Sequence, residues 1–439
     1  MPSGPDDLHS DARMARWRRA RHAELCGGHG SDGAGAIGQT DVLEGPGFLY
    51  RPRQILVETG VMQTQPVETE LQKHGGVPDD QLNQRFGAAK LPVQAYLMPP
   101  EVYIPGLVAQ LRDRPYGEWG APAANVSANH VFCGEPGDYH GGPYGEPASA
   151  SPFPETGYGG PATGAPEIAV LDTGYDTQIE TLHPGLDPRV VYQPGPGSPE
   201  IPLTTSGYLA QEAGHGTFID GVIMQLAPRV SIRQVQVLSP AGVTDDACVA
   251  LAIRALGNSV PVINLSLGGY TQGDTAPPAT SAAIAALTDN VVVVAAAGNN
   301  QSPEPFWPAA FNSAVSVGAL DTTQGAPQVA GFSNYGTWVD VYAPGMNVYS
   351  TYLRDPWLLP NDAPPPRQMD GWATWSGTSF AAPQVAAAIA STLLQSGGTA
   401  RQAAHTVLSQ AQWLPVTGLP GITGVMAYIP PGPGVIFPA

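Results

Sequence analysis

Residues 291–299 read Val-Val-Val-Val-Ala-Ala-Ala-Gly-Asn, an uninterrupted apolar run that stops at a glycine and an asparagine. An apolar run without polar alternation is typical of a strand that is buried on both faces. Further apolar runs of this kind lie at 167–171, 230–237, 260–265 and 314–317, and stretches of helical composition lie at 245–256, 280–287 and 379–396. Buried strands that alternate with helices predict an α/β fold, a doubly wound parallel sheet with helices on both faces.

Four polar residues fall where the ligand crevice of such a sheet lies, outside the carboxyl ends of the strands. Asp172 directly follows the run 167–171, and Asn299 ends the run quoted above. His215 lies between two glycines, and Ser379 opens the helical stretch 379–396. Unpaired N–H groups and the positive end of the helix dipole favour a negatively charged oxygen beside such a serine. Taken singly, each residue also fits a structural role as a turn residue, an ordinary histidine or a helix cap.

The joint occurrence of these residues and their order decide between the two interpretations. Asp, His and Ser follow one another in the order of the subtilisin triad, which differs from the chymotrypsin and α/β-hydrolase orders. The segments VLDTG, HGT, SLGG, AAAGN, FSNYG, APG and GTSFAAP occur in family order across about 165–430. On these segments the chain resembles a subtilisin-like (S8) serine peptidase. An α/β-hydrolase esterase is excluded, because no GxSxG nucleophile elbow precedes an acid and a histidine.

The resemblance assigns a role to each matching position. It implies that Ser379 is the nucleophile, that His215 is its general base and that Asp172 orients that base. It implies that Asn299 and the backbone N–H of Ser379 form the oxyanion hole. A polypeptide substrate would pair, as an added strand, with three residues of SLGG: Ser266, Leu267 and Gly268. The implied reaction is peptide-bond hydrolysis through an acyl-enzyme.

The same resemblance implies that no metal or organic cofactor takes part in the chemistry. Subtilisin-like enzymes often bind structural calcium, but the sequence assigns no ligands for it. His183, in LHPGL, is expected to belong to a structural loop rather than to the active site.

Two departures from the family pattern follow the candidate base, where this chain has HGTFIDG instead of HGTHVAG. Phe218 is expected to face the core. Asp220 places a carboxylate about one helical turn from His215, and we hypothesise that it raises the pKa of the imidazole if it points toward it. Two alternatives stay open at this point: a catalytically silent homologue that binds peptides, and a sedolisin-type peptidase, which is disfavoured because that family has Glu at the place of His215.

The N-terminal third has a different texture. Residues 1–48 are polar and aperiodic, which predicts an irregular segment. Residues 49–133 predict a ferredoxin-like β-α-β-β-α-β domain, with strands at 54–58, 82–86, 91–98 and 126–133 and helices at 67–74 and 104–113. This unit resembles the inhibitory propeptide of the family, so we expect an intramolecular inhibitor and a zymogen. Gly and Pro then dominate 134–165, which predicts an exposed linker that has no helix or strand. The resemblance to the propeptide implies that this linker reaches the active site and is cut there. The catalytic domain would be 166–439.

Composition limits the partners. The 37 acidic and 19 basic residues give a formal net charge of −18, which argues against binding to nucleic acid or to an anionic membrane surface. No secretory h-region and no transmembrane run is apparent, so we expect a cytoplasmic protein, or a secreted one if the start is misassigned.

Overall fold

The structure is a computed structural model of the 439-residue chain. It describes residues 43–45, 47–59, 65–113, 126–134, 147–152, 160–175, 179–186, 189–193, 212–238, 242–323, 325–358 and 367–430. Most of the predicted irregular segment 1–48 lies outside these ranges, as do 135–146 and 153–159 of the predicted linker.

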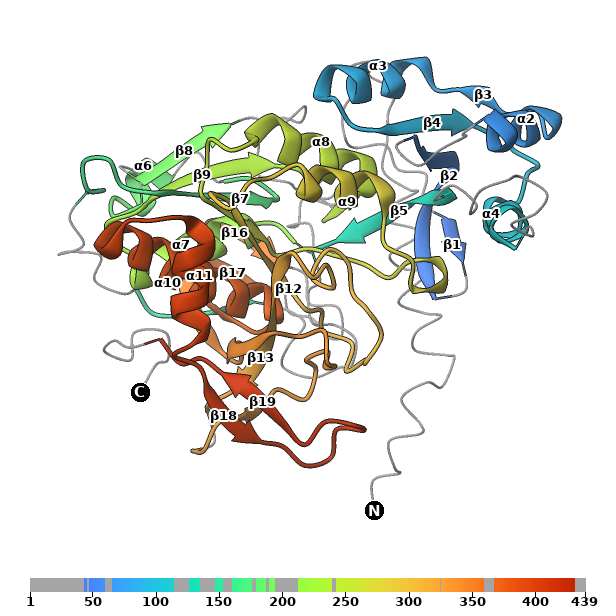
Figure 1. The fold of residues 1–439 in the computed structure, drawn as a ribbon. Coiled ribbons are helices and arrows are strands. Elements are labelled where there is room, and N and C mark those ends of the chain that lie inside the picture. The colour runs from blue at the N-terminus through green and yellow to red at the C-terminus, as the bar shows by residue number, and fades with distance from the viewer. Residues whose placement is uncertain are drawn as a thin grey trace.

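A ten-stranded sheet forms the larger part of the molecule (Figure 1). Its strands, in order across the sheet, are β18 (Gln412–Pro415), β19 (Gly424–Ala427), β15 (Val341–Pro344), β13 (Ala314–Asp321), β12 (Val292–Ala296), β11 (Val262–Leu265), β7 (Glu167–Asp172), β9 (Ser231–Gln236) and β8 (Val190–Gln193), with β14 (Gln328–Val329) beside β13. All neighbours from β19 to β8 are parallel, whereas β18 and β14 pair antiparallel. The predicted parallel sheet is confirmed.

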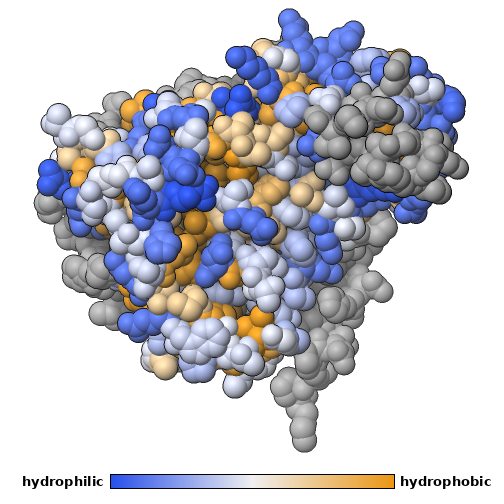
Figure 2. Space-filling model, viewed as in Figure 1, coloured by the Kyte–Doolittle hydropathy of each residue, from blue (hydrophilic) through white to orange (hydrophobic). Residues whose placement is uncertain are grey.

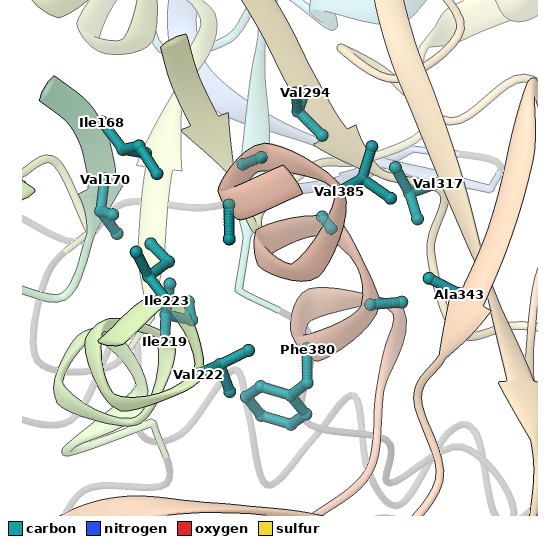
Figure 3. Close-up of a cluster of buried hydrophobic side chains, with 14 of the residues drawn as sticks. Ile168, Val170, Ile219, Val222, Ile223, Val294, Val317, Ala343, Phe380 and Val385 are labelled. Atoms are coloured by element: carbon teal, nitrogen blue, oxygen red, sulfur yellow. The ribbon is translucent and has the colours of Figure 1, made fainter. Parts of the chain in front are cut away.

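Helices cover both faces of this sheet, and a separate cluster of apolar side chains lies between the sheet and the helices on each face. On one face lie α7 (His215–Leu226), α10 (Thr378–Ser396) and α11 (Ala400–Leu408); on the other lie α8 (Asp246–Leu256) and α9 (Pro278–Ala285). Figure 3 shows α10 between the sheet and α7, with Phe380 and Val385 among side chains of both. The alanines of α10 allow this close approach, and its first residues are thereby fixed at the sheet edge.

A second sheet belongs mainly to the N-terminal domain, drawn in blue in Figure 1. It contains β1 (Leu43–Gly45), β2 (Phe48–Glu58), β3 (Val77–Pro78), β4 (Val93–Leu97) and β5 (Val126–Cys133), which are accompanied by α2 (Gln65–Lys73), α3 (Asp80–Ala89) and α4 (Ile104–Arg112). Its β5 continues by antiparallel pairing onto β10 (Val243–Asp245), which lies in the predicted catalytic domain 166–439. The two domains therefore share one sheet.

One element of the N-terminal domain was predicted wrongly. Residues 82–86 lie in helix α3, not in a strand. The side chain of Asp79 caps this helix by accepting a hydrogen bond from Leu82 N (3.0 Å). Leu82 and Phe86 are four residues apart and both buried, which is helical spacing. The solvent-facing side of α3 carries the hydrophilic side chains at the top of Figure 2.

The prediction that 134–165 has no strand is also wrong. β6 (Ala148–Ser149) pairs with β17 (Arg367–Trp375), which in turn pairs with β16 (Val348–Leu358), in a small antiparallel sheet. Ala148 and Ser149 keep their backbone N–H groups and can pair with a neighbouring strand although the residues around them are rich in Gly and Pro, so composition alone missed this contact. The remaining short elements are α6 (Ile179–Leu182) and the 3-10 helix η4 (Gln272–Asp274).

Candidate active site

The side chains of Asp172 and His215 meet at the carboxyl edge of the large sheet. Asp172 is the last residue of β7, and His215 is the first residue of α7. Asp172 Oδ1 accepts a hydrogen bond from His215 Nδ1 (2.8 Å), and it also accepts from the backbone N of Thr173 (2.7 Å). Because a carboxylate only accepts, Nδ1 carries the proton and Nε2 of the neutral ring has a lone pair. This is the tautomer that a general base requires.

The imidazole of His215 is buried, and its charged neighbours still favour protonation. Burial by itself lowers the pKa of His215, but the charge of Asp172, its hydrogen bond and the charge of Glu212 together raise the pKa above its ordinary value. The ring packs against Trp375 and Phe380, with centroid distances of 5.4 and 5.3 Å. These aromatic contacts fix the ring plane, and Phe380 directly follows Ser379 in the chain.

Ser379 is the second residue of α10 and is almost completely buried. Its Oγ donates to the carbonyl oxygen of Ser266 (3.4 Å). His215 Nε2 makes no hydrogen bond within the described part of the chain, so the hydroxyl and the imidazole are not joined in this structure. Rotation about the Cα–Cβ bond of Ser379 would redirect Oγ toward the imidazole. Catalytic hydrogen bonds of this kind often tighten only when a substrate is bound.

The side-chain amide of Asn299 is held in one orientation. Its Oδ1 accepts hydrogen bonds from the backbone N (2.8 Å) and the hydroxyl (2.9 Å) of Thr378. Two donors on Oδ1 identify the opposite end as the NH₂ group, which lies beside Gly377: a Cβ atom added there would be 3.5 Å from Nδ2. The Thr378 clamp therefore directs an N–H donor toward the start of α10, next to Ser379.

Ser266, Leu267 and Gly268 follow β11 directly. Ser266 Oγ donates to the backbone oxygen of Ser379 (2.8 Å), so this segment and the start of α10 hold each other in place. Gly268 exchanges two backbone hydrogen bonds with Cys133, the last residue of β5, at 2.8 and 2.9 Å. Next along the chain, the N–H of Gly134 donates to Gly242 O (3.1 Å). The end of the N-terminal domain thus lies, as an added strand, between the segment 266–268 and β10.

The carboxylate of Asp220 does not hydrogen-bond the imidazole. Asp220 Oδ1 accepts from Gln234 Nε2 (3.1 Å), and burial raises the pKa of Asp220 well above its ordinary value. The charges that raise the pKa of His215 are those of Asp172 and Glu212. Our hypothesis about Asp220 therefore finds no support in these contacts, whereas Glu212, which the sequence did not single out, acts on the imidazole.

Two residues outside the site are placed as expected. Phe218 is fully buried between Trp375 and Phe380. His183 is buried and its Nε2 lies 3.0 Å from the carbonyl oxygen of Tyr352. Both are core residues.

The described residues contain no cluster of three or more His, Cys, Asp or Glu side chains that could hold a metal ion. The expectation of structural calcium remains without assigned ligands. Across the same residues, no helix is both long and apolar enough to cross a bilayer.

Comparison with known proteins finds a matching family. The model of the Subtilase family matches residues 164–425. A thermophilic serine proteinase of Bacillus sp. (strain AK1) is 33% identical over 231 residues, which are half of this chain and half of that protein. Subtilisin Savinase of Lederbergia lenta is 34% identical over 234 residues, which are 51% of this chain and 74% of that protein.

Among solved structures, fervidolysin from Fervidobacterium pennivorans, described as a keratinolytic enzyme related to subtilisin, is similar with a TM-score of 0.57. The sequence identity is 20%, and the match covers 88% of this chain and 61% of that chain. At this identity the likeness shows a shared fold and nothing more.

Proposed function

The chain belongs to the subtilase family, and on that basis we propose that it is a serine endopeptidase with Ser379 as nucleophile. The observation that carries the proposal is the buried hydrogen bond of 2.8 Å between His215 Nδ1 and Asp172, beside a serine at the start of α10. An imidazole fixed in this tautomer presents Nε2 as a proton acceptor.

In the proposed reaction, His215 Nε2 removes the proton of Ser379 Oγ as that oxygen attacks a peptide carbonyl carbon. Asp172 holds the ring and stabilises the imidazolium that forms. Negative charge develops on the carbonyl oxygen, and the NH₂ group of Asn299 and the backbone N–H of Ser379 stabilise it by hydrogen bonds. The imidazolium then protonates the leaving amine, and water hydrolyses the acyl-enzyme by the same route.

A fluorophosphonate probe tests this assignment. We expect it to label the wild-type enzyme on Ser379 and to leave the Ser379→Ala variant unlabelled, with a peptide substrate cleaved only by the former. A well-folded wild-type chain that neither reacts with the probe nor cleaves peptides would instead be a catalytically silent homologue.

We further propose that the N-terminal domain is an intramolecular inhibitor. Three contacts support this: β5 pairs with β10, Cys133 pairs with Gly268, and Arg51 Nε lies 2.8 Å from Asp245 Oδ2. Apolar residues of β2, α3 and β4 also pack in one cluster with residues of α8 and α9. A strand in this position excludes a substrate from the segment 266–268.

Intact mass measured after purification tests the zymogen proposal. We expect the wild type to lose roughly its first third through cleavage within 134–165, whereas Ser379→Ala stays full length. Equal processing of both proteins would assign the cut to another protease and remove the argument for self-activation.

A further inference from the structure

The carboxylate of Glu212 lies under the strand that covers the site. Glu212 is fully buried and precedes His215 by three residues, with its backbone oxygen accepting from His215 N (3.1 Å). Two glycines remote in sequence, Gly134 and Gly242, flank its side chain. A Cβ atom added to either would lie well inside contact distance of the Glu212 carboxylate. Two missing side chains therefore make room for one acidic group.

The backbone of Gly134 does not itself require glycine, because its φ lies outside the left-handed region. The obstacle to a side chain there is the Glu212 carboxylate, with Leu238 Cδ1 at 3.1 Å from the added Cβ forming the neighbouring wall. Glu212 is a flexible side chain whose end can shift when a larger group enters. The place of Gly134 thus borders one acidic and one apolar side chain, and it becomes a pocket only when the Glu212 carboxylate shifts.

The register of the covering strand tells which substrate residue meets this pocket. Cys133 pairs antiparallel with Gly268, so the place of Gly134 lies opposite Leu267, and the next residue of a bound chain would lie opposite Ser266. The carbonyl oxygen of Ser266 is 3.4 Å from Ser379 Oγ. A chain bound in this register brings the carbonyl of the residue opposite Ser266 to the nucleophile. The pocket therefore receives the residue immediately before the one whose carbonyl is attacked.

We propose that Glu212 is a specificity-determining residue that selects lysine or arginine at this substrate position and rejects acidic side chains. This rests on the proposed peptidase function. A cationic side chain would replace Gly134 over the carboxylate and form a close charge pair in a water-excluded place. The net charge of −18 also attracts cationic peptides in general, but only Glu212 distinguishes this position from its neighbours.

Peptides that differ only at this position test the proposal. We expect kcat/KM of the wild-type enzyme for lysine to exceed that for leucine by about tenfold or more, and glutamate to be the poorest. In Glu212→Gln the lysine-to-leucine ratio should fall to near one, whereas Asp220→Asn, which removes another buried acid, should keep the wild-type ratio. Ratios within one enzyme cancel any general loss of activity. Leucine preferred by the wild type, or an unchanged ratio in Glu212→Gln, would overturn the proposal.

A second measurement does not depend on catalysis. In the full-length Ser379→Ala chain, hydrogen exchange of the β5 amides reports how firmly the covering strand is held. We expect Gly134→Lys to keep more protection than Gly134→Leu, and the difference to vanish when Glu212→Gln is added. Equal protection in the first two variants would refute the role of Glu212 even if no peptide is cleaved. Loss of all peptide cleavage together with the expected exchange pattern would reject the proposed peptidase function and leave the pocket assignment standing.

Discussion

The catalytic domain and the N-terminal domain are both sheets packed on helices, but they hold their polar groups in different ways. In the catalytic domain, Asp172, His215 and Asn299 are each fixed by hydrogen bonds to groups of the same domain. In the N-terminal domain, two arginines reach across to the other domain: Arg51 donates to Asp245, and Arg112 donates to the carbonyl oxygen of Gln272. These catalytic groups are thus arranged without help from the N-terminal domain, which suits the proposed removal of that domain.

The largest expected effect concerns a group that belongs to the catalytic domain alone. Asn299→Ala should lower kcat by about 10²–10³, the loss known for the oxyanion asparagine of subtilisin itself rather than one worked out for this chain. Steady-state kinetics with a peptide substrate measures it. Asn300→Ala is the matched control, because Asn300 Oδ1 accepts from Tyr270 OH, whereas the two donors of Thr378 bond to Asn299 Oδ1. A loss of similar size in both variants would point to damaged folding.

Acid should loosen the N-terminal domain through His130. Its Nε2 accepts from the backbone N of Gln272 (3.0 Å) across the domain boundary, and Ser127 and Arg112 are its polar neighbours within its own domain. Burial, with the charge of Arg112, lowers the pKa of His130 from 6.5 to about 3. In the open state, with the N-terminal domain detached, His130 has its ordinary pKa, so between pH 6.5 and about 3 this state binds more protons than the docked state. Docking of the N-terminal domain is therefore strongest above pH 6.5 and weakens as the pH falls.

Hydrogen exchange of the β5 amides in the full-length Ser379→Ala chain measures this opening. The opening equilibrium should rise by up to about tenfold per pH unit below 6.5. His130→Gln keeps a neutral acceptor and should remove the dependence. The same acid response in both proteins would place the titrating group elsewhere.

A smaller effect is expected from the ion pair between the domains. Arg51 and Asp245 are both mostly buried, so Arg51→Met should weaken docking by about 1–3 kcal/mol. Protection of the β5 amides in the same full-length background reports the loss. Arg53→Met is the control on the same strand, because Arg53 Nε donates to Met98 O within its own domain. If the control loosens β5 as much as Arg51→Met does, the ion pair is not what joins the domains.

The smallest expected effects are pH shifts that distinguish two buried acids of the catalytic domain, Glu212 and Asp220. Glu212 contributes to the raised pKa of His215, so Glu212→Gln should lower that pKa and move the acid limb of the kcat/KM profile to lower pH. Asp220→Asn should leave the limb in place, because Asp220 hydrogen-bonds with Gln234. A shift in Asp220→Asn alone would restore our hypothesis from the sequence.

Much of the catalytic domain was predictable because its signals are local. Runs such as 291–296 are buried on both faces and are therefore apolar at every residue. Asp172 lies at the end of such a strand, and His215 and Ser379 lie at the starts of buried helices. The wrong strand at 82–86 shows the limit of this approach. Two apolar residues four apart fit either a short strand or one helical face, and the cap at Asp79 decides between them.

The sequence by itself determined the buried parallel sheet, the order of its chemical groups and the family that they resemble. Only the tertiary structure decided which groups touch. It directed Asp220 to Gln234, placed Glu212 near His215 and laid Cys133 against Gly268. The physical reason is the distance along the chain over which each interaction acts. Periodicity and helix caps depend on a few neighbouring residues, whereas the partner of a buried carboxylate belongs to a distant segment that packing brings beside it.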